Sequence, residues 1–301
     1  MWFKNLKLFT ITSPLDWNEI DLDEQLKEFA FRPCGSQETS SMGFSSPLGQ
    51  GDSMVHVAQG RVWVTLKKQE RILPAAVVNA ELVEKVSQIE TETGSPVGKK
   101  AQQDLKQEII QRLLPQAFTK NSYTHGFISF KDNLVAVDAS ADGKTEAYLA
   151  MIRKAMTSLP VIPLSRKSIQ GELTSWLQDS SAPANVVLLE EAEFRGLGEQ
   201  DSIVKVKNQD LLDDEILQHL EAGKLVQKLA IEWDESLTAM IEEDLSVKRL
   251  KFTDVVKEQN DDIAKEDKLA RLDADFALMS GEIVRFALWL KEVFALDEQS
   301  Q

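Results

Sequence analysis

A pair of helix-like segments between strand-like segments is the feature that most restricts the fold of this chain. Apolar residues recur at helical spacing over residues 77–89, up to a break at Gly94-Ser95-Pro96, and again over residues 100–114. The segments on either side alternate like strands. We therefore interpret residues 74–121 as a helical hairpin that projects from an α+β body.

The remaining segments predict what surrounds this hairpin. Strands are expected at residues 2–11, 54–58, 61–68, 124–130 and 134–138, and helices at residues 21–30 and 145–158. After Pro163 a new unit is expected, with helices near 173–178 and 211–221 and a long C-terminal helix at 266–290. The predicted fold class is α+β with mixed or antiparallel sheets. Its regions are a centre (1–73 and 122–163), the hairpin (74–121) and a last α+β region (164–301).

Three strand-like segments within residues 203–252 carry basic side chains two or four positions apart. Because side chains alternate between the faces of a strand, Lys205 with Lys207, Lys224 with Lys228, and Arg249 with Lys251 are each expected to point the same way. If the strands share a sheet, they form a basic face. The whole chain nevertheless carries a formal net charge of −15, and residues 201–301 hold thirteen Lys/Arg against twenty-four Asp/Glu.

This contrast leaves two interpretations of the basic strands. A positive face on an acidic protein is suited to binding a polyanion through its phosphates, without reading bases. Alternatively, the lysines only solvate an outer sheet face and discourage edge-to-edge aggregation.

The sequence contains no convincing catalytic or metal-binding pattern. Asp142-Gly143-Lys144-Thr145 opens a predicted helix as a phosphate-binding loop does, but such a loop needs glycine at position 138, and the carboxylate of Asp138 would repel a phosphate. Cys34 has no nearby histidine, which favours a structural thiol over a nucleophile. The three histidines lack metal-ligand spacing. We predict a protein that is not an enzyme and uses no cofactor or metal.

The sequence also favours a cytoplasmic location. The N-terminal apolar stretch is too short and too soon followed by charge to be a signal peptide, and no apolar run reaches about 18 residues. A single cysteine excludes an intramolecular disulfide, which fits a reducing compartment.

Phe118 lies just beyond the second predicted helix of the hairpin, where chains usually become polar. An aromatic side chain there could anchor a partner subunit. It could equally fold back onto its own helix, and the sequence leaves both readings open.

Several short segments, taken in order, carry a family resemblance. They are Met1-Trp2-Phe3-Lys4-Asn5-Leu6, Pro33-Cys34-Gly35-Ser36-Gln37, Leu113-Leu114-Pro115 with Ala117-Phe118, Ser158-Leu159-Pro160-Val161, Glu221-Ala222-Gly223-Lys224, Lys248-Arg249-Leu250-Lys251-Phe252, and Asp273-Ala274-Asp275-Phe276 with Gly281-Glu282. Together they resemble the RdgC family of bacterial recombination-associated proteins over essentially the whole chain.

The resemblance implies a nucleoid-associated protein that binds single- and double-stranded DNA without sequence preference and restrains RecA-promoted strand exchange in recombination and replication. It also implies a curved protomer and a ring-shaped homodimer with a positive hole for DNA, in which Phe118 of the hairpin tip is a dimer contact. By position, the candidate DNA-binding residues are Lys205, Lys207, Lys224, Lys228, Lys248, Arg249 and Lys251. Asn208 departs from this pattern, because a basic residue is expected there.

Two other functions remain as alternatives at this point. One is an acidic scaffold that acts on recombination proteins, RecA among them, through protein contacts. The other is a nucleotide-dependent enzyme that uses Gly143-Lys144-Thr145.

Overall fold

The structure is a computed structural model that describes residues 1–15, 17–196, 202–264 and 266–296. The chain divides into two compact units. The first comprises residues 1–28, 46–65 and 124–301, and the second comprises residues 29–45 and 66–123. Both are α+β. Residues 29–45, 66–73 and 122–123 of the predicted centre lie in the second unit, and the rest of the predicted centre lies in the first unit together with residues 164–301.

One sheet of the first unit is built from strands between residues 7 and 163. Its strands are β1 (Lys7–Ile11), β3 (Val55–Ala58), β6 (Leu134–Val137) and β7 (Val161–Pro163), together with parts of β4 (Arg61–Ile72) and β5 (Phe118–Ser129). Their order is β3-β4-β5-β6-β1-β7. Helices α1 (Glu19–Lys27) and α4 (Asp142–Ala155) bury one face each, which follows from their apolar residues at helical spacing.

A second, antiparallel sheet in the same unit has the order β12-β11-β10-β8-β9, and we call it the five-stranded sheet. Its strands are β8 (Val186–Arg195), β9 (Ile203–Lys207), β10 (Leu225–Trp233), β11 (Leu237–Glu242) and β12 (Val247–Phe252). Helices α5 (Gln170–Gln178), α6 (Asp214–Glu221), α7 (Asp254–Lys257) and α8 (Lys268–Val293) accompany it. The sequence had predicted β9, β10 and β12, but not β8 or β11.

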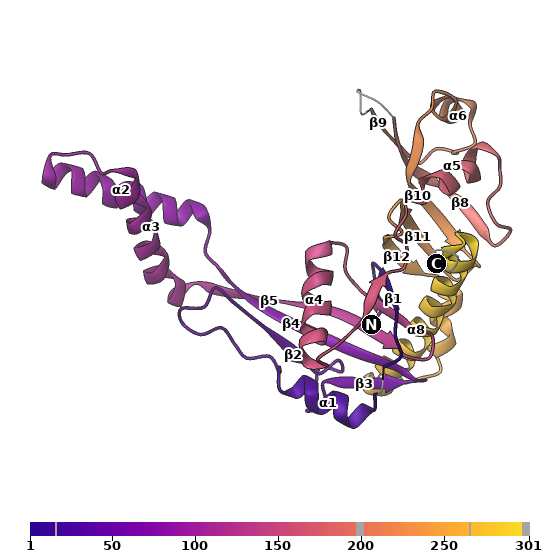
Figure 1. Ribbon diagram of the computed structural model, residues 1–301, viewed down its shortest axis with the longest axis horizontal. Helices are drawn as coiled ribbons and strands as arrows, with labels where there is room; N and C mark the ends of the chain where they lie inside the picture. Colours follow the sequence, from indigo (N-terminus) through magenta and orange to yellow (C-terminus); the bar gives the residue numbers. More distant parts are fainter. Residues whose placement is uncertain (16, 197–201, 265, 297–301) are drawn as a thin grey trace. The chain divides into compact units, whose positions relative to one another are not determined.

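Helix α8 joins the two sheets of the first unit (Figure 1). Phe276, near its start, stacks on Trp63 of β4 at 5.0 Å between ring centroids. Further along, Phe286 packs on Trp233 of β10 at 5.1 Å. Both contacts belong to one buried hydrophobic cluster, so the two sheets share a core rather than forming separate domains.

The N-terminal segment forms a second connection between the sheets. The sequence predicted a strand from residue 2, but β1 begins at Lys7 and the residues before it run along β12. The backbone oxygen of Lys4 accepts a hydrogen bond from the amide of Leu250 at 2.8 Å. Asp138 accepts hydrogen bonds from the backbone amides of Lys4 and Asn5, at 3.1 and 2.9 Å. Asp138, which stands where a phosphate-binding loop would have glycine, therefore has a structural role.

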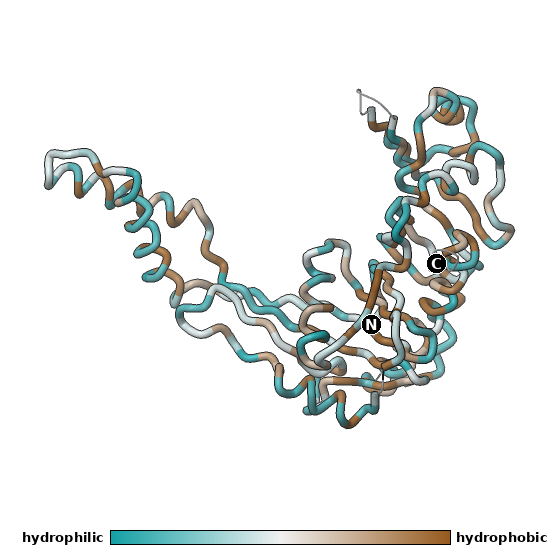
Figure 2. Tube along the Cα trace, in the orientation of Figure 1, coloured by the Kyte–Doolittle hydropathy of each residue, from teal (hydrophilic) through white to brown (hydrophobic). Residues whose placement is uncertain are grey.

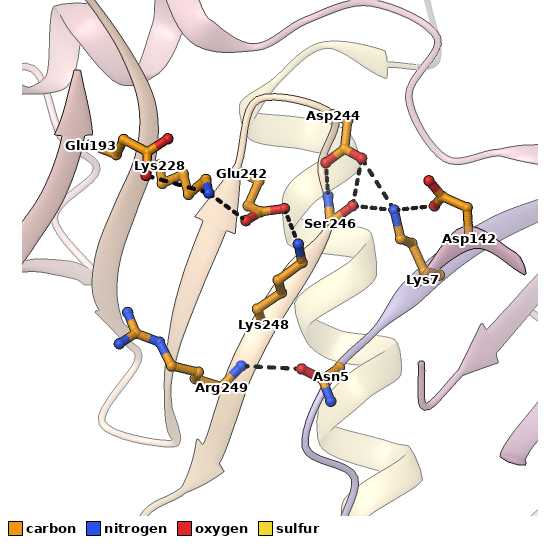
Figure 3. A network of polar contacts seen from close by, with 10 residues as sticks. All are labelled: Asn5, Lys7, Asp142, Glu193, Lys228, Glu242, Asp244, Ser246, Lys248 and Arg249. Atoms are coloured by element: carbon orange, nitrogen blue, oxygen red, sulfur yellow. Dashed lines mark hydrogen bonds and ion pairs between the residues drawn. The ribbon is translucent and has the colours of Figure 1, made fainter. Parts of the chain in front are cut away.

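Lys7 of β1 forms ion pairs with residues next to both sheets (Figure 3). Its ammonium lies 2.7 Å from Asp142, at the start of α4, and 3.1 Å from Asp244, in the turn between β11 and β12. Burial acts to lower the pKa of Lys7, but the hydrogen bonds and charges of the two carboxylates outweigh it and raise the pKa overall. Asp142, at the start of the predicted helix, therefore forms a structural ion pair with Lys7.

The second unit contains the predicted helical hairpin. Helices α2 (Ala75–Thr93) and α3 (Lys99–Leu113) pack on each other, and the short 3₁₀ helix η1 (Leu114–Gln116) follows them. Hydrophobic residues interrupt the hydrophilic stretches of both helices (Figure 2), but only Val78 and Ile109 of the two are buried. The unit also contains β2 (Ser40–Ser45), beside β4, in a segment where no strand was predicted from the sequence.

Candidate nucleic-acid interface

A row of alternating charges crosses the five-stranded sheet. Lys228 on β10 lies opposite Glu242 of β11 on one side and opposite Glu193 of β8 on the other, and Glu193 in turn lies opposite Lys205 of β9. Residues directly opposite in an antiparallel ladder share a face of the sheet. The ammonium of Lys228 is 3.4 Å from each carboxylate, and that of Lys205 is 3.2 Å from Glu193. Figure 3 shows the part around Lys228 and Glu242.

Three further ion pairs widen this row into a charged face. Lys207 of β9 lies 3.5 Å from Glu191 of β8, and Arg249 of β12 approaches the same carboxylate at 2.8 Å. Lys248 lies 2.6 Å from Glu242. We call these side chains the charged face. They are Lys205, Lys207, Lys228, Lys248 and Arg249 with Glu191, Glu193 and Glu242.

A β-bulge explains why Lys248 and Arg249, consecutive in sequence, both reach this face. Arg249 has φ +54°, and the pairing of β11 with β12 shifts between Thr238 and Met240. Lys248 lies opposite Met240, and Lys251 lies opposite Thr238. Simple alternation would have placed Lys248 on the other face of the strand.

A second irregularity affects the pair Lys224 and Lys228. The pairing of β10 with β8 shifts between Val226 and Lys228, so alternation cannot be carried from one lysine to the other. Lys224 also precedes β10, which begins at Leu225. Regular alternation, on which the expectation that these two lysines point the same way depended, is therefore not present between them.

The local charge of the face is +2, from five cations and three carboxylates, within a chain of net charge −15. The hydrogen bond from Arg249 holds the pKa of Glu191 below its usual range, so this carboxylate stays charged. Burial acts to lower the pKa of Lys228, but Glu242 and Glu193 outweigh it and raise the pKa. Glu191 and Lys228 are thus both charged at neutral pH, and the ion pairs of the face compensate most of its charge from within.

Two of the candidate lysines differ from the rest. Neither Lys224 nor Lys251 forms an ion pair or a side-chain hydrogen bond with any residue in the described part of the chain. Lys251 is exposed and Lys224 is half-buried. Asn208, just after β9, is exposed and has φ +54°. The sequence therefore predicted strands β9, β10 and β12 but did not show which of their cations form ion pairs.

The sequence interpretation did not include the glutamates of the charged face. Glu191 and Glu193 lie on β8, within Val-Val-Leu-Leu-Glu-Glu-Ala-Glu-Phe-Arg, where apolar and acidic residues alternate over the second half. That alternation is typical of a half-buried strand, but it is weaker than the lysine pattern. Glu242 lies on β11, a strand that was not predicted from the sequence.

The described residues contain no group of three or more His, Cys, Asp and Glu side chains placed to hold a metal ion. Among the helices in the same part of the chain, none is long and apolar enough to cross a membrane.

Comparison with known proteins defines the class. A family model described as "RdgC: Putative exonuclease, RdgC" matches residues 1–297. Relatives named "Recombination-associated protein RdgC" include those of Pseudoalteromonas atlantica, 66% identical over the full length of both chains, and Colwellia psychrerythraea, 45% identical over 98% of this chain and 97% of the relative. That of Aeromonas hydrophila is 43% identical over the full length of both. These relatives are recombination-associated proteins. The chain belongs to the RdgC family, as the sequence resemblance predicted.

Proposed function

We propose that this protein binds single- and double-stranded DNA without sequence preference, through phosphate contacts to the charged face and to Lys224 and Lys251. As part of the same proposal, it acts as a ring-shaped homodimer that encircles or coats DNA within the nucleoid. By occupying DNA it restrains RecA-promoted strand exchange. Membership of a family named for recombination makes DNA the natural ligand.

The observation that carries the proposal is the concentration of cations on one sheet of an acidic chain. Five cations and three carboxylates meet on the charged face, while the chain as a whole has formal charge −15. Lysine and arginine attract phosphates, and the surrounding negative charge repels DNA from other surfaces.

Titration of DNA duplexes of unrelated sequence at several salt concentrations tests the proposal. We expect equal affinities for all sequences and a steep loss of affinity with rising salt, because phosphate binding releases counterions. A flat salt dependence, or strong preference for one sequence, would contradict phosphate contact.

Neutralising Lys224, Lys228 and Lys251 together by substitution with glutamine is expected to weaken binding to every sequence alike. Three fewer phosphate contacts reduce the salt slope by up to about three, which corresponds to a loss of a hundredfold or more near 0.1 M salt. A matched control replaces the exposed lysines Lys99, Lys100 and Lys131 with glutamine, which removes the same charge elsewhere. Equal losses in both triple variants would show a general charge effect and no local site.

Phe118 is the proposed contact between subunits. It is 84% exposed, so it does not fold back onto its own helix in this chain, and such a large apolar surface is costly in water. In sedimentation velocity we expect wild-type protein to be dimeric and Phe118→Ser to shift toward monomer. Val83→Ser, on exposed α2, is the control, since Val83 is 69% exposed. A dimer that is unaffected by Phe118→Ser would remove this residue from the interface.

The acidic scaffold remains the second candidate, because the net charge of −15 favours contact with basic protein surfaces as well. A strand-exchange assay with the lysine triple variant separates the two mechanisms. Restraint by DNA occupancy predicts that the variant no longer blocks exchange. If a variant that does not bind DNA still blocks RecA, the scaffold mechanism replaces ours.

We propose a binding role rather than a catalytic one. Glu191, Glu193 and Glu242 each pair with two cations, which leaves these carboxylates committed to charge compensation. Incubation of end-labelled DNA with the protein and Mg²⁺ or Mn²⁺ should leave the strands intact. Progressive shortening would establish an exonuclease instead.

A further inference from the structure

A groove lies beside the charged face on the five-stranded sheet, where the N-terminal segment crosses β12. Its volume is about 1070 Å³. It shares Glu191 and Arg249 with the charged face, so the two surfaces are continuous. Unlike the charged face, the groove is lined by an aromatic ring and apolar side chains as well as by cations.

The floor of the groove is apolar and well ordered by packing. Ala230, Met240, Leu250 and Phe252 contribute to it, and all four are buried. Trp2 forms one wall, where its ring lies 4.9 Å from that of Phe252 at an interplanar angle of 49°. Trp2 is only half-buried, so part of the indole surface remains open to the groove.

The cations of the groove show what charge its occupant should carry. Arg249 is compensated by Glu191 at 2.8 Å, and Lys257 has Asp254 at 4.0 Å. Lys4 and Lys251 are exposed and form no ion pair through their ammonium groups with any described residue. Two uncompensated lysines beside an apolar, aromatic surface favour a ligand that combines negative charge with flat apolar faces.

We infer that this groove receives unpaired bases of single-stranded DNA, which stack on Trp2 while Lys4 and Lys251 hold the adjoining phosphates. The inference rests on the proposed DNA binding and assigns it a second subsite. Stacking on an aromatic ring with lysines along the backbone is the general way in which proteins bind single strands without reading sequence. A duplex buries the faces of its bases, so its phosphates can contact the charged face and Lys251, but its bases cannot stack on Trp2.

Binding of three fluorescent DNA probes tests the inference by anisotropy. The probes are an oligothymidine, a single strand of the same length made of abasic sites, and a duplex. The first two carry the same phosphates and differ only in their bases. Wild-type protein should bind the oligothymidine about tenfold more tightly than the abasic strand, since stacking contributes about 1–3 kcal/mol per base.

Trp2→Leu should abolish this difference while leaving duplex affinity unchanged, and Trp2→Phe should keep most of it. The matched control is Trp17→Leu. Trp17 is also half-buried against a phenylalanine, with its ring 4.3 Å from that of Phe130, but it does not line the groove. Should Trp2→Leu unfold the protein, photo-crosslinking of an iodouracil-containing strand to wild-type protein should modify the peptide that contains Trp2.

The outcomes separate this inference from the proposed function. Failure of all three probes to bind would overturn DNA binding itself. Equal binding of the oligothymidine and the abasic strand by wild-type protein, or an undiminished preference in Trp2→Leu, would overturn only the base subsite. If Trp2→Leu changes the oligomeric mass and leaves the base preference intact, the groove binds a second copy of the chain instead.

Discussion

Replacing Glu191 and Glu242 with glutamine is expected to increase the affinity of the protein for DNA. The two carboxylates hold Lys207, Arg249, Lys228 and Lys248 within 3.5 Å. Neutralising them raises the local charge of the charged face from +2 to +4. It also frees cations that, in the wild-type protein, would have to break an ion pair with a glutamate before they could bind a phosphate. Two more available contacts should steepen the salt slope by about two and raise affinity near 0.1 M salt by roughly tenfold to a hundredfold.

Titration of one duplex with wild-type and double-variant protein over a salt series measures this change. Glu24→Gln with Glu28→Gln is the control, because both residues are exposed on or next to α1, away from the charged face. Circular dichroism should confirm that the freed cations do not unfold the sheet by mutual repulsion. Unchanged or weaker binding by the Glu191→Gln, Glu242→Gln variant would show that DNA does not meet these side chains.

Gly126→Ala is expected to destabilise the first unit severely. A Cβ at this position would lie 2.7 Å from the Cζ and hydroxyl oxygen of Tyr148 and 2.8 Å from the backbone oxygen of Ala136. Neither neighbour can yield easily. Tyr148 is fully buried and its hydroxyl donates to the backbone oxygen of Val64 at 3.1 Å, while Ala136 belongs to the ladder between β5 and β6. Overpacking of this kind should lower the free energy of unfolding by about 3 kcal/mol or more.

Urea denaturation followed by tryptophan fluorescence measures the loss. Gly171→Ala is the matched control, because nothing lies within 4 Å of its added Cβ and the residue is inside α5. That variant should be neutral or gain up to about 1 kcal/mol from helix propensity. A Gly126→Ala protein as stable as the wild type would mean that β5 and α4 do not approach each other as closely as described.

Much of the fold could be predicted because it depends on local periodicity. The hairpin helices and the C-terminal helix follow from apolar spacing, and α8 extends over Lys268–Val293, close to the predicted 266–290. Strands β8 and β11 were missed, since β8 changes from an apolar run to alternating apolar and acidic residues and β11 is a short, mostly apolar segment. Because these two strands were not predicted, the predicted site lacked the glutamates that lie between the lysines.

The candidate site was less predictable, because it depends on which strands pair with each other. Alternation along one strand shows which side chains share a face, but it does not show which strand lies opposite. The pairing of Lys228 with both Glu193 and Glu242 depends on residues 35 positions before it and 14 after it, brought together by the ladder register. The bulge at Arg249 likewise depends on the partner strand, so Lys248 could not be placed from its own segment.

Lysine footprinting tests the central claim, that DNA binds the charged face of the five-stranded sheet, most directly. The protein is acetylated with and without a duplex of arbitrary sequence, and each lysine is quantified by mass spectrometry. We predict that DNA protects Lys205, Lys207, Lys228, Lys248 and Lys251, while Lys99, Lys100 and Lys106 of α3 keep their reactivity. Protection of the α3 lysines, with unchanged reactivity on the five-stranded sheet, would contradict this account.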